Sequence, residues 1–301
     1  MLLEELLGND KVKKELKNIV ETEKVTHSYL FVGPEGVGKK QFAIALAQML
    51  LCQNKEQKPC TTCKSCIELE GNNHPDFFLL SSEGTIKIDQ IRKLQARIIE
   101  KPILSDKKVY IIDNSENMTP EAQNCLLKTL EEPPSYMVLI LIASNENQIL
   151  KTILSRCMKI TFDKIPDEAI ANYFKKTQQK EVTKQQLLLY EGRIGKALSL
   201  QDKEQVYKQI EEQIETMQTT SLLSFWKQAE LFSKNKEHII PILDYMNLLF
   251  LEKGKQQISK RVNYLNCIER IEKTKRNLKA NSNFDMSMDQ LLLKIWEEIN
   301  E

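Results

Sequence analysis

Short apolar runs alternate with amphipathic stretches through the first half of the chain. Apolar residues recur at helical spacing over residues 10–21 and again over residues 39–51. Short runs of branched and aromatic residues lie between such stretches and are typical of buried strands. Alternating strands and helices predict a mostly parallel sheet with helices on both faces. We expect strands at 28–32, 76–80, 109–112, 138–143 and, at one edge, 158–162, with further helices at 88–98, 120–130 and 149–154.

The second half of the chain has a different character. Two short helices are predicted at 166–176 and 184–191, and no strand pattern remains after about residue 203. Apolar stripes such as the one through Ile239, Met246 and Phe250 indicate a bundle core, although part of a stripe can instead pack against other subunits. Amphipathic stretches lie near 203–217, 220–233, 236–252, 261–279 and 287–299. The pattern predicts an α/β domain at 1–162, a small helical domain at 163–201 and an all-helical domain at 202–301.

Composition narrows the classes of function. The 301 residues include 43 basic and 42 acidic side chains, for a net charge of +1. A protein that neutralises many phosphates by itself needs a basic excess, so any contact with nucleic acid is expected to be local, shared or absent. No apolar run is long enough to span a bilayer, and the N-terminal segment lacks the basic start of a secretory signal. We therefore expect no membrane association and a cytoplasmic location.

The segment GPEGVGKK at residues 33–40 is an altered phosphate-binding loop. Gly33, Gly38 and Lys39 fit the pattern G-x-x-x-x-G-K-[ST], and the loop lies between a predicted strand and a predicted helix, as the motif requires. Lys40 replaces the hydroxyl residue that normally ligates Mg²⁺. Lysine has three donors and no acceptor, so Mg²⁺ binding is not expected. Binding of ATP or ADP stays open.

A second nucleotide motif is altered as well. The apolar run VYIID ends in Asp113, at the Walker B position, and this carboxylate can still reach a metal. Asn114 follows, where hydrolases of this layout carry a glutamate that activates water. An amide has no basic lone pair suited to that task. The two losses favour a former ATPase over a working one, although a purely structural Gly turn is an alternative.

Four cysteines lie within fifteen residues: Cys52, Cys60, Cys63 and Cys66. The spacing C-x₇-C-x₂-C-x₂-C lets four thiolates converge on one ion, and such a set suits a closed structural Zn²⁺ site. The alternative is four free surface cysteines. His74 is expected to be a loop histidine. The segment contributes Lys55, Lys58 and Lys64 but also Glu56, Glu68 and Glu70, and it has no aromatic residue, which argues against a dedicated nucleic-acid reader.

Five segments occur in one order and together carry a resemblance. They are HSYLFVG at 27–33, the phosphate loop, the four-cysteine segment, LLKTLEEPP at 126–134 and TILSRC at 152–157. The chain resembles the bacterial DNA polymerase III clamp-loader subunits of the AAA+ class over residues 1 to about 200. This resemblance implies an AAA+ P-loop domain, a helical lid domain and a helical collar domain that serves oligomerisation.

Within this family the chain resembles the delta-prime type of subunit rather than the gamma/tau motor type. The motor subunits carry an arginine in a G-x-x-R-x-A-L segment, and here GRIGKAL places Gly195 at that position, with Arg193 displaced from it. Ser144 and Asn145 still offer polar groups at the sensor-1 position. The resemblance assigns Arg156 of the SRC motif as an arginine finger that acts in trans on the ATP site of a neighbouring subunit.

The resemblance implies a subunit of a hetero-pentamer with gamma/tau and delta subunits. This assembly opens the sliding clamp and places it on primed DNA, and the chain is expected to support that work without hydrolysing ATP. Two alternatives remain open from the sequence: an active gamma/tau-like ATPase in which Lys40 and Asn114 are tolerated, and a subunit that binds nucleotide without hydrolysing it.

Overall fold

The computed structural model describes residues 2–82, 84–201, 204–217, 229–280 and 282–300. Five parallel strands form one sheet in the order β2-β3-β4-β1-β5. Strand β1 lies between β4 and the edge strand β5 and pairs with both, so that Tyr29 lies opposite Ile140 and Met158. The strands are β1 (Ser28–Val32), β2 (Phe77–Leu80), β3 (Lys108–Ile112), β4 (Met137–Ala143) and β5 (Met158–Thr161).

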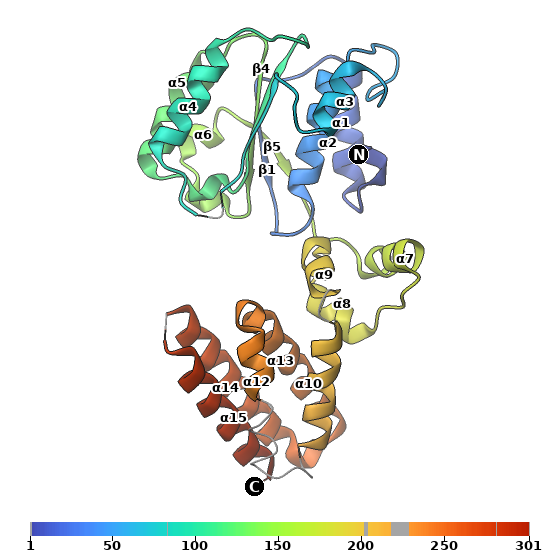
Figure 1. The fold of residues 1–301 in the computed structure, drawn as a ribbon, viewed down its shortest axis with the longest axis vertical. Coiled ribbons are helices and arrows are strands. Elements are labelled where there is room, and N and C mark those ends of the chain that lie inside the picture. The colour runs from blue at the N-terminus through green and yellow to red at the C-terminus, as the bar shows by residue number, and fades with distance from the viewer. Residues whose placement is uncertain (1, 83, 202–203, 218–228, 281, 301) are drawn as a thin grey trace. The chain divides into compact units, whose positions relative to one another are not determined.

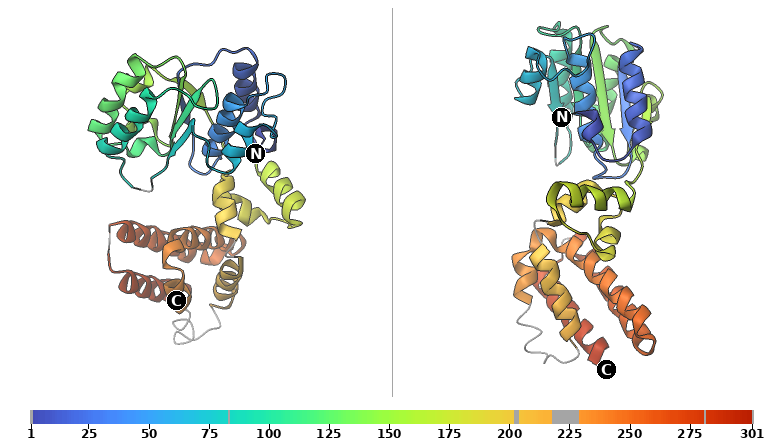
Figure 2. Two further views of the ribbon diagram at one scale, coloured as in Figure 1. Left: turned by 45° about the horizontal axis from the view of Figure 1, so that its top comes forward. Right: turned by 90° about the vertical axis from the view of Figure 1, so that its right-hand side faces the viewer.

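Both faces of the sheet are covered, which explains the unbroken apolar runs. Every residue of β1, β3 and β4 is buried. Successive side chains of a strand point to opposite faces, so Tyr29 and Phe31 join one core, whereas Leu30 and Val32 join the other. Figures 1 and 2 show α1 and α2 on one side of the sheet and α4 and α5 on the other.

Two helices of the N-terminal unit begin at residues that favour the start of a helix. Thr119 accepts a hydrogen bond from the Ala122 N–H and is followed by Pro120, which together start α5. Gly38 precedes α2 in a left-handed conformation. The bounds are α1 (Asp10–Glu21), α2 (Lys39–Leu51), α3 (Lys64–Glu70), α4 (Ile88–Ile99), α5 (Pro120–Glu131), α6 (Lys151–Leu154) and α7 (Asp167–Gln178).

The chain forms two compact units. The first comprises residues 1–180 and 192–195, and the second comprises 181–191 and 196–301. In the second unit α14 packs against both α13 and α15, and Phe250 stacks on Tyr264 with ring centroids 6.1 Å apart. The remaining helices are α8 (Lys184–Tyr190), α9 (Ile194–Gln201), α10 (Glu204–Thr216), α12 (Ala229–Lys234), α13 (Ile239–Gln256), α14 (Arg261–Lys279) and α15 (Phe284–Asn300).

The predicted parallel sheet with flanking helices is confirmed, including the edge position of β5. Helix α3 was not predicted from the sequence, because seven residues make only about two turns and show no clear helical period. The predicted helix at 220–233 lies partly outside the described residues. The separate lid and collar domains stay a prediction. Among the described residues, no helix combines the length and apolarity that a bilayer crossing needs.

Candidate functional site

The phosphate loop connects β1 to α2 at the carboxyl end of the sheet. Gly33 lies so close to β5 that an added Cβ would be 2.4 Å from the carbonyl oxygen of Phe162. Gly38 has φ 99°, in the left-handed region that favours glycine, and directly precedes the first turn of α2. The two glycines of the motif are therefore required by the backbone path of the loop.

Lys39 is buried, with 6% of its surface exposed. Its ammonium donates to the carbonyl oxygens of Gly33 at 2.6 Å and Pro34 at 2.8 Å, and to Ser144 Oγ at 3.1 Å. Burial lowers the pKa of Lys39, and nearby carboxylates oppose that shift. Three donors thus meet three acceptors of the protein itself, so a phosphate would have to displace at least one of them.

Lys40 extends to the Walker B carboxylate. Its Nζ lies 3.1 Å from Asp113 Oδ2 and 3.2 Å from Ser81 Oγ, and Ser81 Oγ lies 3.2 Å from the same Asp113 oxygen. Ser81 follows β2 and Asp113 follows β3, which are neighbouring strands. The residues present do not fit the Mg²⁺ that the fold family implies, because an ammonium lies against the carboxylate and no hydroxyl follows Lys39.

The groups around Asp113 differ from those of a hydrolytic site. Asn114 adopts φ 52°, and its side-chain amide donates to the carbonyl oxygen of Ser82 at 3.4 Å. Glu116 Oε1 accepts a hydrogen bond from the Ser144 N–H at 2.8 Å. Sequence reasoning missed Glu116, which brings a carboxylate next to the sensor-1 position and partly opposes the lowering of the Lys39 pKa by burial.

Gly195 lies against the phosphate loop. Its N–H donates to the carbonyl oxygen of Gly36 at 2.8 Å. An added Cβ at position 195 would lie 3.1 Å from Gly36 Cα and 3.3 Å from its oxygen. A side chain here would therefore push the loop away. The absence of an arginine at this position allows a direct backbone contact between the two glycines.

Arg156 follows the short helix α6, and three of the five recognised segments meet around it. Ser28 of HSYLFVG donates its hydroxyl to the Arg156 carbonyl oxygen at 2.7 Å. Glu131 of LLKTLEEPP accepts from Arg156 Nη2 at 2.8 Å, and Thr152 of TILSRC accepts from Nη1 at 2.9 Å. The arginine side chain remains 35% exposed. The guanidinium is held in place at the surface, outside the core.

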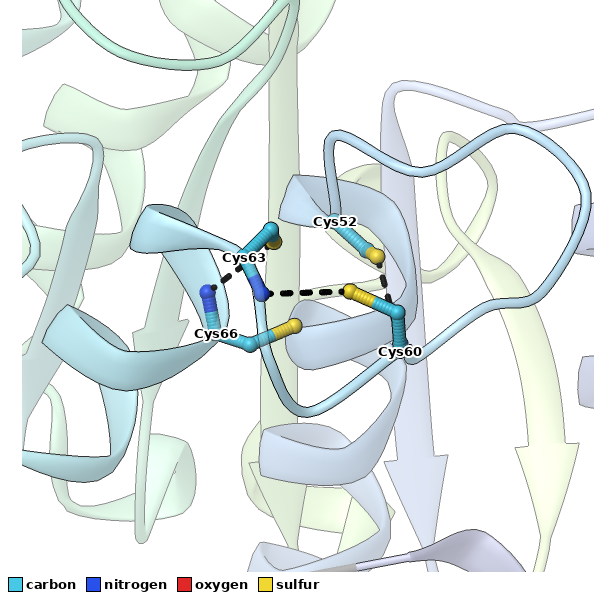
Figure 3. A group of neighbouring side chains, drawn as sticks. All are labelled: Cys52, Cys60, Cys63 and Cys66. Carbon is cyan, nitrogen blue, oxygen red and sulfur yellow. Dashed lines mark hydrogen bonds between the residues drawn. The ribbon is translucent and has the colours of Figure 1, made fainter.

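The four predicted zinc ligands lie together. The sulfur atoms of Cys52, Cys60, Cys63 and Cys66 are all within 4.8 Å of one another, and their side chains point toward a common centre (Figure 3). A tetrahedral zinc with bonds of about 2.3 Å separates its sulfur ligands by roughly 3.8 Å, so the cluster is close to that size. The N–H groups of residues 60, 63 and 66 donate to Sγ atoms of the cluster at 3.4, 3.3 and 3.5 Å. The residues present fit a structural Zn²⁺.

The thiols of this cluster have different environments. Burial raises the pKa of Cys52 and of Cys66. Backbone N–H groups of Thr62 and Cys63 lower the pKa of Cys60 to about 6. A bound Zn²⁺ would supply the positive charge that keeps all four as thiolates.

A buried polar network anchors the cysteine segment to the sheet. His74 Nδ1 accepts from the Asp76 N–H at 3.0 Å, so the proton of the neutral ring is on Nε2, which lies 2.7 Å from Ser65 Oγ. Ser65 in turn donates to the carbonyl oxygen of Leu51 at 2.6 Å. Burial lowers the pKa of His74 and favours this neutral form. The predicted loop histidine is thus a buried link between α3 and β2, with neither ring nitrogen available to a metal.

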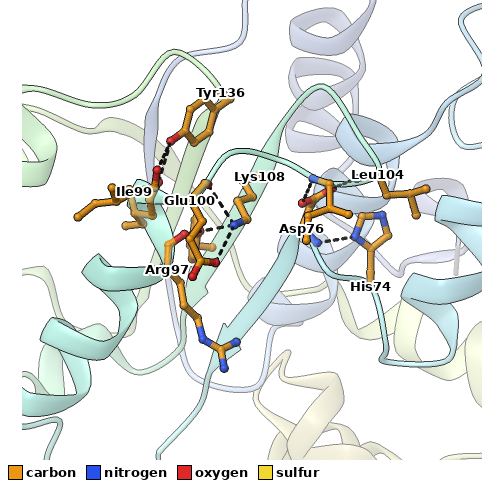
Figure 4. Close-up of polar contacts among 11 residues, drawn as sticks. His74, Asp76, Arg97, Ile99, Glu100, Leu104, Lys108 and Tyr136 are labelled. Atoms are coloured by element: carbon orange, nitrogen blue, oxygen red, sulfur yellow. Dashed lines mark hydrogen bonds and ion pairs between the residues drawn. The ribbon is translucent and has the colours of Figure 1, made fainter.

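Asp76 holds the loop that precedes β3. Its carboxylate accepts from the N–H groups of Ile103 at 2.8 Å, Leu104 at 2.7 Å and Ser105 at 2.9 Å (Figure 4). Ser105 also donates its hydroxyl to the Leu51 carbonyl oxygen at 2.8 Å, beside Ser65. Asp76 therefore fixes the loop on which the end of α2 and the cysteine segment rest.

The end of α4 is capped by side chains from the same region. Lys108, which is 4% exposed, donates to the carbonyl oxygens of Arg97 at 3.2 Å and Glu100 at 3.1 Å. Tyr136 donates to those of Ile98 and Ile99, at 3.0 Å each. These contacts, also in Figure 4, satisfy carbonyl groups that have no partner within the helix. The loop at 101–107 is thereby fixed at both ends.

Replacing Asp76 with alanine is expected to lower the free energy of unfolding of the N-terminal unit by ~3–5 kcal/mol, because three N–H groups lose their acceptor. Denaturation followed by circular dichroism measures the loss, and hydrogen exchange at residues 103–105 locates it. Asp106→Ala, an exposed neighbour, is the control and should change stability by less than about 0.5 kcal/mol. Equal effects of the two changes would contradict the anchoring role.

Comparison with known proteins shows the family to which the chain belongs. The model for the family described as DNA polymerase III, delta subunit, matches residues 8–166, which is more than half of the chain. The chain belongs to this family. The DNA polymerase III delta-prime subunit of Bacillus subtilis is 38% identical over 161 residues, which cover 53% of this chain and 49% of that protein. The delta-prime subunit of Pseudomonas aeruginosa is 39% identical over 137 residues, 44% of this chain and 42% of that protein.

The delta-prime resemblance predicted from the sequence is confirmed, and the match spans about half the length of the relatives just named. A DNA polymerase III gamma/tau subunit of Mycoplasma pneumoniae is 33% identical over 178 residues, 59% of this chain and 26% of that protein. A solved gamma subunit-related protein of DNA polymerase III from Thermotoga maritima aligns with a TM-score of 0.56 at 20% identity, over 94% of this chain and 99% of that one. At this identity the likeness shows a shared fold alone.

The structure brings the predicted residues together in three places. Gly33, Gly38, Lys39, Lys40 and Asp113 meet at the phosphate loop, the four cysteines form the cluster, and Arg156 lies apart from both. Sequence reasoning named Asp113 and Ser144 but missed other partners of these residues, among them Ser81 and Glu131. Glu131 lies in the segment LLKTLEEPP, so that motif could have identified it as a candidate. Ser81 belongs to none of these motifs, so the sequence did not identify it.

Proposed function

We propose that this chain is a delta-prime-like subunit of the DNA polymerase III clamp loader that does not hydrolyse ATP and that donates Arg156 in trans to a neighbouring motor subunit. The observation that carries the proposal is the setting of Arg156. Ser28 and Glu131 fix it from two separate segments, yet the guanidinium stays at the surface. Such a group can reach a phosphate that belongs to another subunit.

The chain's own phosphate site supports a non-catalytic role. Lys40 pairs with Asp113, Asn114 replaces the base that would activate water, and the donors of Lys39 are satisfied within the protein. Positioning and charge stabilisation supply nearly all of the catalysis in phosphoryl transfer. A site that lacks the metal ligand and the base is therefore better suited to a structural role in the assembly than to hydrolysis of ATP.

In this proposal the chain joins gamma/tau and delta subunits in a hetero-pentamer that loads the sliding clamp onto primed DNA. The C-terminal helices supply the collar, and residues 163–201 correspond to the lid. Zn²⁺ is bound by the four cysteines as a structural ion. The membership of the family and the delta-prime relatives support this assignment.

One observation favours a second candidate, an active ATPase. Glu116 brings a carboxylate close to Lys39, and among the buried side-chain atoms of the described residues its Oε2 has no hydrogen-bond partner. A carboxylate at that place can act as a base in the way that Asn114 cannot. Measuring ATP turnover by the isolated chain separates the two candidates.

The test compares ATP turnover by the purified chain with turnover by motor and delta subunits before and after the chain is added. We expect the chain alone to show no activity that depends on Lys39, with Lys39→Ala as the reference, and we expect turnover of the mixture to rise when the chain joins it. Lys39-dependent hydrolysis by the isolated chain would establish the ATPase instead. Failure to co-elute with the other subunits would remove the clamp-loader assignment.

A further inference from the structure

The ion pair between Lys40 and Asp113 occupies the place at which a divalent cation is held in working phosphate-loop enzymes. Lys40 is in the first turn of α2, next to Lys39, at the position of the hydroxyl ligand. Asp113 is the carboxylate that follows β3. We propose that the Lys40 ammonium is a built-in replacement for the divalent cation, so that this pocket neither needs nor admits a metal ion.

The geometry around the ammonium resembles that of a bound cation. Two oxygens from two neighbouring strands face it, Asp113 Oδ2 at 3.1 Å and Ser81 Oγ at 3.2 Å. Ser81 also donates to the same Asp113 oxygen at 3.2 Å, which closes a triangle of three groups. The side chain of Asp113 is 13% exposed, so this oxygen is largely removed from water. The triangle links α2 to the ends of both strands.

A metal ion and this ammonium exclude each other. Mg²⁺ requires oxygen ligands at about 2.0–2.1 Å in near-octahedral geometry. The Asp113 oxygen already faces the Lys40 ammonium, and the positive charge of that group repels a second cation. A lysine side chain is covalently attached to the chain, so the replacement is permanent. Unlike a metal ion, it also cannot leave with a product.

This inference goes beyond the proposed function, because it concerns the chain's own pocket and holds whether or not Arg156 acts in trans. It predicts that a single substitution restores a metal site. Lys40→Thr removes the ammonium and supplies the hydroxyl of the ordinary motif, so that the oxygens of Asp113 and Ser81 no longer face a positive charge and can take an ion.

The experiment titrates Mn²⁺, alone and with ADP, into the full-length chain. Binding is followed by electron paramagnetic resonance, and paramagnetic broadening of the amide signals of residues 38–40 and 113–114 locates the ion. The variants are Lys40→Thr, Lys40→Thr combined with Asp113→Asn, and Lys13→Thr. Lys13 is the matched control, because it also lies 3.1 Å from an aspartate, Asp10, but on α1.

We expect the wild-type chain and Lys13→Thr to show no broadening at these amides, with or without ADP. Lys40→Thr should bind Mn²⁺ at least about tenfold more tightly than the wild type, and Asp113→Asn should remove the gain. Broadening at 38–40 and 113–114 in the wild type would overturn the proposal, and this measurement needs no variant. A folded Lys40→Thr chain that binds Mn²⁺ no better than Lys13→Thr would overturn it as well. Neither result depends on ATP turnover by an assembled clamp loader.

Discussion

Replacing Arg156 with alanine is expected to lower ATP turnover at the site of the neighbouring subunit, which we propose that Arg156 completes, by on the order of 10³-fold, the lower end of the effect of arginine fingers. The guanidinium is already positioned by Glu131 and Thr152 and remains 35% exposed. A nucleoside triphosphate carries more negative charge than one carboxylate, so it can compete with Glu131 for the Arg156 guanidinium. The loss should therefore appear in the chemical step of a neighbour, with this chain still in the complex.

The measurement is the burst of phosphate release after the reconstituted complex is mixed with ATP, clamp and primed DNA. Arg156→Ala should reduce the burst by the contribution of one site while the complex still co-elutes. Arg92→Ala is the control, since Arg92 also pairs with an acidic neighbour, Asp89, on the outside of α4. A burst equal to that of the control would exclude the action in trans.

Glu131→Gln refines the same experiment. An exposed ion pair contributes only about 0–1 kcal/mol, so this change should leave folding intact. If Glu131 merely orients the arginine, turnover should stay within a few-fold of the wild-type value. A loss as large as that of Arg156→Ala would assign a direct role to the carboxylate instead.

The second large effect is expected from the loss of zinc. Purified chain should contain one Zn²⁺, and removing it with a chelator should lower the Tm of the N-terminal unit. At free zinc a thousand times its Kd, the ion contributes about 4.1 kcal/mol. For a unit of this size that corresponds to a fall in Tm of roughly 8–16 °C. The cluster lies at the end of α2, so the loss is transmitted to a helix of the core.

Cys66→Ser should reproduce this fall without a chelator and abolish the response to added zinc. Cys125→Ser is the matched control, because Cys125 lies outside the cluster and its thiol donates to Gln95 Oε1 at 3.1 Å, a contact that a serine hydroxyl can also make. Metal content by mass spectrometry and thermal melting report the two consequences separately. A chain that purifies without zinc and melts at the same temperature with and without chelator would contradict the structural role.

The sheet was predictable from the sequence because β1, β3 and β4 are buried on both faces. Every position of β1 and β4 is apolar or small, and such a short unbroken run is typical of a buried parallel strand. The cysteine cluster was predictable because its ligands lie within one short segment. Both predictions depend on local spacing, which a single sequence displays directly.

Contacts between distant segments were not predictable in the same way. The pairing of Lys40 with Asp113 depends on the order of strands in the sheet and on the direction of one flexible side chain. The pairing of Arg156 with Glu131 joins a loop to the end of a helix 25 residues away. The buried state of His74 depends on Ser65 and Ser105, whose hydroxyls carry no motif. In each case the contact itself depends on the fold, even where the sequence had already named both residues, as for Lys40 and Asp113.

The contact between Gly36 and Gly195 disfavours any side chain at position 195, including the arginine that the family resemblance led us to expect there. Any such side chain introduces a Cβ 3.1 Å from Gly36 Cα, so the loop has to move before the new side chain can be accommodated. Replacing Gly195 with arginine should thus displace the phosphate loop before the new guanidinium can make any contact. The same steric barrier makes position 195 a marker in homologous chains. A glycine here predicts that the phosphate loop contacts this position directly, and a larger residue predicts a loop that is displaced from it.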